Sequence, residues 1–138
     1  MPITMLQTVL DAVDIRALAE FYRQLLDLDY RPGDEPPVDA GPDDTDDTDW
    51  IVIQRADGSG RLAFQQVEEL PEPTWPTGPV PQMLHLDLTA PTMDELRAAD
   101  RRALDLGARL LYDRWDDPEE PLRVYADPAG HPFCIFLA

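Results

Sequence analysis

Residues 7–28, QTVLDAVDIRALAEFYRQLLDL, and residues 85–106, HLDLTAPTMDELRAADRRALDL, resemble each other and superpose without a gap at an offset of 78 positions. Each stretch has an apolar-rich start, a capping residue and apolar residues at helical spacing, which predicts a strand followed by a helix. A chain that duplicates such a unit commonly builds its site between the two copies. The repeat singles out Gln7 in the first copy and His85 in the second.

The first half of the chain extends the repeated unit with a polar loop and two further strands. Asp14 is a good N-cap, and Gln7, Val9 and Asp11 fall on one face of the strand before it. The polar loop is rich in Pro, Gly, Asp and Thr, so we expect it to be mobile. A short second strand is expected where this loop begins. The predicted segments are a strand at Thr4–Val13, a helix from Ile15 to about Leu26, the loop Arg31–Asp49, and strands at Trp50–Arg55 and Arg61–Val67.

The second half repeats this order after a proline-rich connector at residues 68–82. Thr92 and Glu95 fit a capping box, and Gly107 supplies a helix stop. Each half therefore reads strand, helix, strand, strand, strand, which predicts one α+β domain over residues 1–138 built from halves at residues 1–67 and 83–138. The remaining predicted strands are Met83–Thr89, Ala108–Trp115, Leu122–Ala126 and Pro132–Leu137.

Alternation along the strands assigns their faces. One helix covers only one face of its sheet, so the other face must meet something else, and we expect the free faces of the two halves to surround a cavity. In Met83–Thr89, Leu84, Leu86 and Leu88 belong under the helix, whereas His85 and Asp87 face the cavity. In the last strand, the same alternation turns Cys134 and Phe136 toward the cavity.

The order of these elements resembles the glyoxalase, bleomycin-resistance and extradiol-dioxygenase (vicinal oxygen chelate) superfamily. The resemblance rests on three segments: the one running from Asp11 into Leu26, the strand HLDL at residues 85–88 and the ending DPAGHPFCIF at residues 127–136. The glyoxalase-like branch is the most similar. The resemblance covers nearly the whole chain. It implies two βαβββ modules whose curved mixed sheets form a cup, with the helices packed on the outer faces, and in the catalytic members a divalent metal such as Fe, Mn, Ni or Zn.

The resemblance also implies where metal ligands would stand. Gln7 and His85 occupy the first-strand positions and are the best metal candidates, and Cys134 occupies the last-strand position of the second half, where metal-dependent members commonly have Glu. The last-strand position of the first half is Phe64 or Gln65, depending on the length of the preceding turn. No carboxylate stands at an implied ligand position, although Asp11 and Asp87 lie nearby on the same faces. Lewis-acid chemistry favours hard oxygen and imidazole ligands, so a catalytic metal site of the family type is not expected to be complete.

Two readings of His85 stay open. As a catalytic residue it would act as a base, a hydrogen-bond donor or a single ligand, because an imidazole titrates near neutral pH. As a structural residue it would bond to Asp87, to Gln7 or to backbone. Cys134 lies between Phe133 and Ile135, which favours a small buried thiol over a nucleophile.

Composition limits the partners. The formal net charge of −17 repels a phosphate backbone, so nucleic acid and anionic membranes are poor partners. One cysteine excludes an intramolecular disulfide, and the sequence shows no leader or membrane span, which predicts a cytoplasmic protein. The resemblance makes a homodimer an expectation.

The function predicted first is the binding of a small molecule, cationic or aromatic, in a cavity with a degenerate metal site. The expected contacts are Gln7, Asp11, Phe64 or Gln65, His85, Asp87, Cys134 and Phe136. A metal-dependent lyase, isomerase or dioxygenase with an atypical ligand set is the alternative, and a regulatory domain with a vestigial cavity is a third reading.

Overall fold

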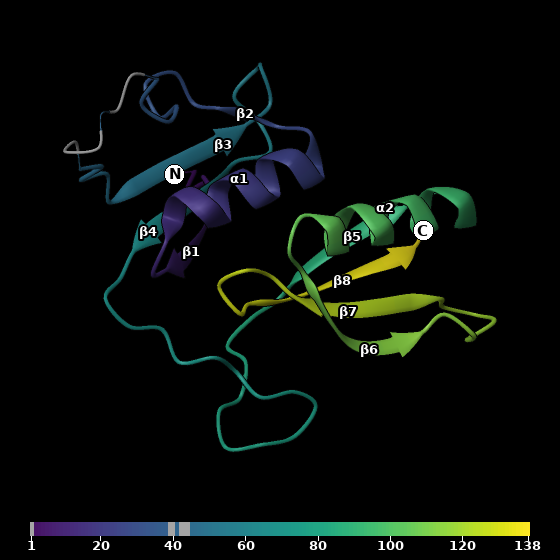
Figure 1. Ribbon diagram of the computed structural model, residues 1–138. Coiled ribbons are helices and arrows are strands. Elements are labelled where there is room, and N and C mark those ends of the chain that lie inside the picture. Colours follow the sequence, from purple (N-terminus) through teal and green to yellow (C-terminus); the bar gives the residue numbers. More distant parts are fainter. Residues whose placement is uncertain (1, 39–40, 42–44) are drawn as a thin grey trace. The chain divides into compact units, whose positions relative to one another are not determined.

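The computed structural model describes residues 2–38, 41 and 45–138 (Figure 1). The chain divides after Leu70 into two compact units. Each unit has one helix and one four-stranded sheet, and in each the helix contacts strands of its own sheet. The protein is therefore α+β, as the sequence predicts.

The first unit has the predicted order strand, helix, strand, strand, strand. Its sheet has the strand order β1-β4-β3-β2, with β1 parallel to β4 and the other neighbours antiparallel. The second strand of this half is only two residues long. The elements are β1 (Thr8–Ala12), α1 (Ile15–Leu26), β2 (Asp29–Tyr30), β3 (Trp50–Gln54) and β4 (Leu62–Gln66).

The second unit repeats this topology. Its sheet has the strand order β5-β8-β7-β6, again with the first and last strands of the unit parallel. The elements are β5 (Leu86–Ala90), α2 (Met93–Asp105), β6 (Arg109–Arg114), β7 (Leu122–Ala126) and β8 (Pro132–Leu137). The sequence repeat thus corresponds to a structural repeat, and both sheets are mixed.

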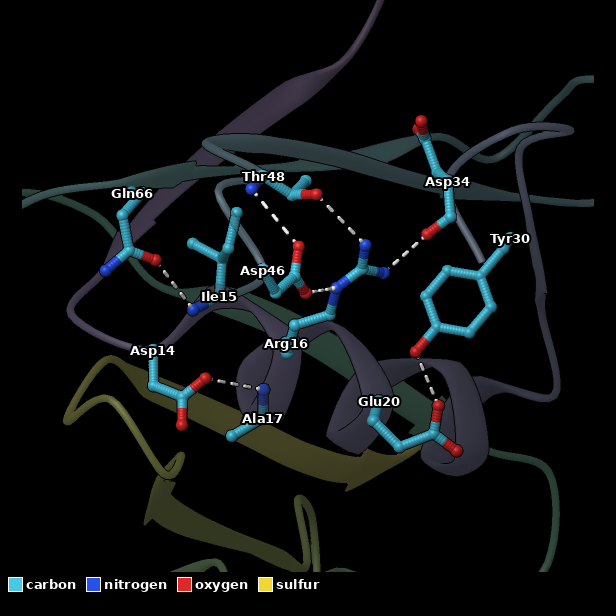
Figure 2. Close-up of polar contacts among 10 residues, drawn as sticks. All are labelled: Asp14, Ile15, Arg16, Ala17, Glu20, Tyr30, Asp34, Asp46, Thr48 and Gln66. Carbon is cyan, nitrogen blue, oxygen red and sulfur yellow. Dashed lines mark hydrogen bonds and ion pairs between the residues drawn. The ribbon is translucent and has the colours of Figure 1, made fainter. Parts of the chain in front are cut away.

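Both helices begin at the predicted caps. The Asp14 carboxylate accepts a hydrogen bond from the backbone N–H of Ala17 at 3.1 Å, and the Ile15 N–H donates to Gln66 Oε1 at 3.2 Å (Figure 2). The Thr92 hydroxyl accepts from the Glu95 N–H at 3.1 Å. These bonds satisfy donors that have no partner within a helix, and a cap of this kind contributes about 1 kcal/mol.

A stacked aromatic pair lies in the core of each unit. Tyr22 of α1 stacks on Phe64 of β4 with ring centroids 6.2 Å apart, and both side chains are fully buried. In the second unit Tyr125 of β7 stacks on Phe133 of β8 at 5.1 Å, and Leu96 of α2 is fully buried. Burial of each large side chain contributes roughly 1.5–3 kcal/mol, so these faces hold the cores.

The guanidinium of Arg16 holds the segment between β2 and β3 against the start of α1. It donates to the Asp34 carbonyl oxygen at 2.6 Å, to Asp46 Oδ2 at 2.5 Å and to Thr48 Oγ1 at 3.2 Å (Figure 2). The described part of the predicted loop Arg31–Asp49 has turns and bends but no helix or strand. Residues 39–40 and 42–44 of that loop lie outside the described residues, and its mobility remains a prediction.

Two predicted strands begin later than expected. The predicted strand Thr4–Val13 starts at Thr8, and the predicted strand Met83–Thr89 starts at Leu86. Continuing the register of β5 and β8 would place His85 opposite Pro132, which has no N–H to donate to a ladder. Gln7 and His85 therefore precede their strands instead of lying within them.

Candidate functional site

The face of the second sheet that lies opposite α2 carries the chemically versatile side chains. Phe133 and Ile135 of β8 are buried on the α2 side, whereas Cys134 and Phe136, which alternate with them, are only half-buried. Asp87 of β5 is exposed and pairs in register with Cys134. This arrangement follows the alternation seen in the sequence.

His85, Asp87 and Cys134 form a compact group on this face. The distance from His85 Nε2 to Asp87 Oδ1 is 3.1 Å, and one nitrogen, oxygen or sulfur atom from each of the three residues lies within 4.8 Å of the other two. The His85 and Asp87 side chains are 42% and 56% exposed, so the group is open to solvent. Phe136 lies two residues beyond Cys134 on the same strand.

The Cys134 thiol is not a ready nucleophile in this setting. Burial, together with the charge of Asp87 and a hydrogen bond between the two side chains, raises its pKa to about 11. The thiol is therefore protonated near neutral pH, and only a thiolate attacks efficiently. Cys134 can donate a hydrogen bond to Asp87 or, once deprotonated, bind a metal ion.

His85 makes the contact with Asp87 that the structural reading of the sequence anticipated. A carboxylate beside an imidazole fixes the orientation of the ring. The contact is compatible with a catalytic and with a structural role of His85, because an oriented imidazole can serve either.

In the first unit, the candidate residues are arranged differently. The Gln7 side-chain oxygen accepts a hydrogen bond from Arg61 Nε at 3.0 Å, and Arg61 also donates to Gln54 at 3.1 Å. The oxygen atom that would bind a metal therefore already accepts one hydrogen bond from a cationic side chain. Gln7 and His85 belong to different compact units, so the pairing of these two positions remains a prediction.

The structure separates the two alternatives for the last strand of the first unit. Phe64 is fully buried beneath α1 against Tyr22, so its assignment as a ligand-contacting residue is corrected. Gln65 is exposed and pairs in register with Asp11 on the other face of that sheet. Gln65 therefore remains the predicted ligand contact in this strand.

The side chains of His85, Asp87 and Cys134 are of types that bind transition-metal ions. They offer an imidazole nitrogen, a carboxylate oxygen and a thiol sulfur, and three protein ligands is the number common in open zinc sites. Within the described residues, this is the one group of at least three His, Cys, Asp or Glu side chains that could surround an ion. The sequence placed the three residues on one face, but not the β5–β8 register that brings Asp87 beside Cys134.

Comparison with known proteins agrees with this architecture. An enzyme of the glyoxalase/bleomycin resistance protein/dioxygenase family from Burkholderia phytofirmans is 16% identical, with a TM-score of 0.65 and 96% of each chain covered. The fosfomycin resistance protein FosX from Mesorhizobium loti is 14% identical, with a TM-score of 0.63 over 100% of this chain and 93% of that one. A glyoxalase-related enzyme from Fulvimarina pelagi is 20% identical, with a TM-score of 0.63 over 98% and 88%.

At these identities the similarity establishes the fold. No curated protein sequence matches the chain. Among the described residues, no helix combines the length and apolar character needed to cross a membrane. The family model for the glyoxalase-like domain matches residues 7–136. With nearly its whole length matched, the chain belongs to the glyoxalase-like domain family, within the glyoxalase, bleomycin-resistance and dioxygenase (vicinal oxygen chelate) superfamily.

Proposed function

We propose that the protein binds a small molecule on the face of the second sheet opposite α2, through His85, Asp87 and Cys134. One observation carries the proposal: three polar side chains of different chemistry gather within 4.8 Å on strands whose other face is closed by α2. Binding sites generally combine a few convergent polar groups with apolar walls, and Phe136 supplies apolar surface on the same strand.

The chemistry of the group favours a cationic or aromatic ligand. Asp87 supplies a negative charge at the site, and the net charge of −17 attracts cations over a longer range. The Phe136 ring offers a surface on which a planar group or a cation can lie. Among the structurally similar proteins, one is named as a fosfomycin resistance protein, and binding of small molecules by this chain extends that likeness as a proposal.

The proposal includes a metal site that has departed from the catalytic pattern. Cys134 stands where the resemblance implies glutamate in metal-dependent members, and the oxygen of Gln7 is bound by Arg61. Ligand binding, rather than turnover, is accordingly the first activity to test.

Thermal-shift measurements in the presence of a chelator test direct binding. The probes are a cationic glycopeptide such as bleomycin and a planar aromatic cation. We expect at least one of them to raise Tm for the wild-type protein, and Asp87→Asn to abolish most of that rise because the carboxylate attracts the cation. Thr89→Ala changes an exposed side chain two residues further along β5 and should leave the rise intact.

Two outcomes would overturn the proposal. One is that no probe changes Tm at high concentration, and the other is that Asp87→Asn and His85→Ala bind every probe as the wild-type protein does. We also propose that the protein forms a homodimer, as its resemblance to the superfamily implies. Light scattering after size-exclusion chromatography tests this.

The second candidate function is a metal-dependent lyase, isomerase or dioxygenase. Its support is the presence of three potential ligand atoms from three residue types in one group. His85 would then be a ligand or the base. Elemental analysis of protein purified without chelator tests this candidate: stoichiometric Fe, Mn, Ni or Zn that disappears in His85→Ala would support it, and protein without metal would count against it.

A further inference from the structure

We infer that the group His85, Asp87 and Cys134 selects a zinc-like ion, that is, a divalent d-block ion that accepts a thiolate, over Mg²⁺ and Mn²⁺. The inference rests on the site of the proposed function and adds the class of ion to it. All three ligands come from the second unit: His85 directly precedes β5, Asp87 lies in β5 and Cys134 lies in β8. No residue of the first unit is needed to complete the set.

The distances suit a small tetrahedral ion after a modest adjustment. Zinc lies about 2.0–2.3 Å from nitrogen, oxygen and sulfur ligands, so two ligands of one tetrahedral ion are about 3.3–3.8 Å apart. His85 Nε2 and Asp87 Oδ1, at 3.1 Å, are already close to that separation. The widest separation in the group is at most 4.8 Å, so the side chains must approach by roughly 1 Å, which half-exposed side chains can do.

The backbone supports this geometry. Asp87 and Cys134 are opposite one another in the parallel ladder of β5 and β8, so their Cα atoms are fixed by strand pairing. His85 stands two residues before Asp87, and its Nε2 lies 3.1 Å from Asp87 Oδ1, so its side chain is on the same face. An ion would therefore join side chains that the sheet has already brought together, with little backbone to reorder.

The sulfur atom decides the selectivity. Thiolate ligands favour zinc and other soft or borderline ions, whereas Mg²⁺ and Mn²⁺ prefer oxygen ligands. The group offers a single carboxylate, which is too few oxygen ligands for those harder ions. Binding of the ion releases the Cys134 proton to solvent and leaves the sulfur as the ligand. A fourth position stays open on the solvent side, because the His85 and Asp87 side chains are about half exposed.

Cobalt(II) provides a direct test, because a cobalt–thiolate bond gives a charge-transfer absorption in the near ultraviolet. Full-length protein is stripped with a chelator, returned to buffer and titrated with Co²⁺. We expect one equivalent to produce the absorption, Zn²⁺ to remove it by competition, and Mg²⁺ and Mn²⁺ at the same concentration to leave it. Cys134→Ser should abolish the band.

Variants of the other two residues separate this site from an isolated thiol. His85→Ala and Asp87→Asn should each weaken Co²⁺ binding by at least the roughly tenfold that loss of an outer-shell partner costs. Thr89→Ala, on the same face of β5, should bind as the wild-type protein does. Circular dichroism checks that each variant is folded, and Cys134→Ser is accompanied by Cys134→Ala so that one misfolded variant does not decide the result.

The absence of the charge-transfer band would overturn the inference. So would a band of unchanged affinity in both His85→Ala and Asp87→Asn, or equal competition by Mn²⁺. The proposed function fails separately: probes that raise Tm in the presence of chelator would support ligand binding even if no ion binds, and ion binding without any probe response would support this inference alone.

Discussion

The carboxylate of Glu20, on α1, is bound by three neighbouring side chains. Arg23 donates to it through Nε at 2.9 Å and Nη2 at 2.5 Å, the Tyr30 hydroxyl donates at 2.5 Å, and Gln24 donates at 3.1 Å (Figure 2 shows the Tyr30 bond). These bonds favour the ionised form. With Arg23 as the largest cause, they lower the pKa of Glu20 from 4.5 to about 2.

A lowered pKa makes this contact a pH-dependent source of stability. The folded-state pKa of Glu20 lies below the unfolded value, so its contribution is complete above pH 4.5 and is lost as the pH falls toward about 2. We expect Glu20→Gln to lower the free energy of unfolding at neutral pH, and the difference from the wild-type protein to shrink below about pH 5. Urea denaturation at a series of pH values measures this difference.

Tyr30→Phe is the matched control for that experiment. It removes one donor and leaves the ion pair with Arg23, so it should retain most of the pH dependence. If the effect of Glu20→Gln were the same at neutral and acid pH, the ionised carboxylate would not be the source of the stability.

At the candidate site, the sequence predicted which face of the sheet each residue lies on, but not which residues lie beside one another. Alternation placed His85 and Asp87 on the face opposite the helix, and Cys134 with them, because side chains alternate with a period of two. Which residue of β8 stands beside Asp87 depends on register, and a shift of one residue exchanges the two faces. For the same reason the sequence left Phe64 and Gln65 as alternatives, which the pairing of Asp11 with Gln65 separates.

Among the elements, the two helices end differently although their sequences align without a gap. After α1, Asp27 has a left-handed φ of 54°, and the Leu28 N–H donates to the Arg23 carbonyl at 2.9 Å. After α2, Gly107 has a φ of 114°, and the Ala108 N–H donates to the Ala103 carbonyl at 3.0 Å. Asp27 thus corresponds in conformation to Gly107, whereas the alignment pairs it with Asp105.

Exchanging the residue types at these two ends should shift stability in opposite directions. A left-handed conformation costs an L-residue about 1–2 kcal/mol, and glycine loses about 0.5–1 kcal/mol through its greater freedom in the unfolded chain. We expect Asp27→Gly to stabilise the protein by about 0.5–1 kcal/mol and Gly107→Asp to destabilise it by a similar amount. Urea denaturation measures both changes.

An added side chain at Gly107 would meet no steric clash, because the atom nearest to its Cβ, Pro128 Cγ, would lie at an ordinary 3.8 Å. The expected loss of stability would therefore come from the backbone conformation. Gly107→Ala, which adds the same Cβ without charge, should also destabilise. A stabilising effect of either Gly107 substitution would contradict the strain argument.

Helix α2 is tied to β7 by a largely buried carboxylate. Asp100, only 6% exposed, accepts hydrogen bonds from the Tyr125 hydroxyl at 2.5 Å and from Arg123 Nη1 at 3.0 Å. Arg123 also donates to Asp113 Oδ2 at 3.0 Å, on the exposed side of β6. One arginine is therefore shared by a buried and an exposed carboxylate.

This shared arginine allows a comparison of the two carboxylates in one protein. Asp100→Ala leaves Nη1 of Arg123 and the buried Tyr125 hydroxyl without their acceptor, and it should cost about 2–4 kcal/mol of stability. Asp113→Ala removes a carboxylate that is 47% exposed and should cost no more than about 1 kcal/mol. Chemical denaturation of the two variants checks the ranking, and equal losses would contradict the dominance of burial.

At the scale of the whole molecule, the sequence predicted the element order of both units, because caps and periodicity are local signals. Asp14, Thr92 and Gly107 mark helix ends through bonds within a few residues. The strand starts were misplaced because they depend on the partner strand, as Pro132 shows opposite the residue before β5. Helix ends, which depend on nearby residues, could be predicted from the sequence. Strand starts, which depend on pairing between distant residues, could not.

The net charge of the whole chain should govern its response to salt. The chain has 28 acidic and 11 basic side chains, so its folded form carries a strong self-repulsion. Ion pairs such as Arg16–Asp46, at 2.5 Å, oppose this, but surface pairs contribute only about 0–1 kcal/mol each. Contacts this short are weakly screened, whereas repulsion between distant carboxylates is screened strongly.

We therefore expect Tm to rise between about 0.01 M and 0.1 M NaCl, because the Debye length falls from about 30 Å to about 10 Å over that range. Differential scanning calorimetry measures the change, and KCl should give the same rise if screening rather than binding of a particular cation is the cause. In Asp47→Asn, which removes an exposed acidic charge, the rise should be slightly smaller. A Tm that falls over this range would contradict this expectation. It would mean that the ion pairs stabilise the folded protein more than the long-range repulsion destabilises it.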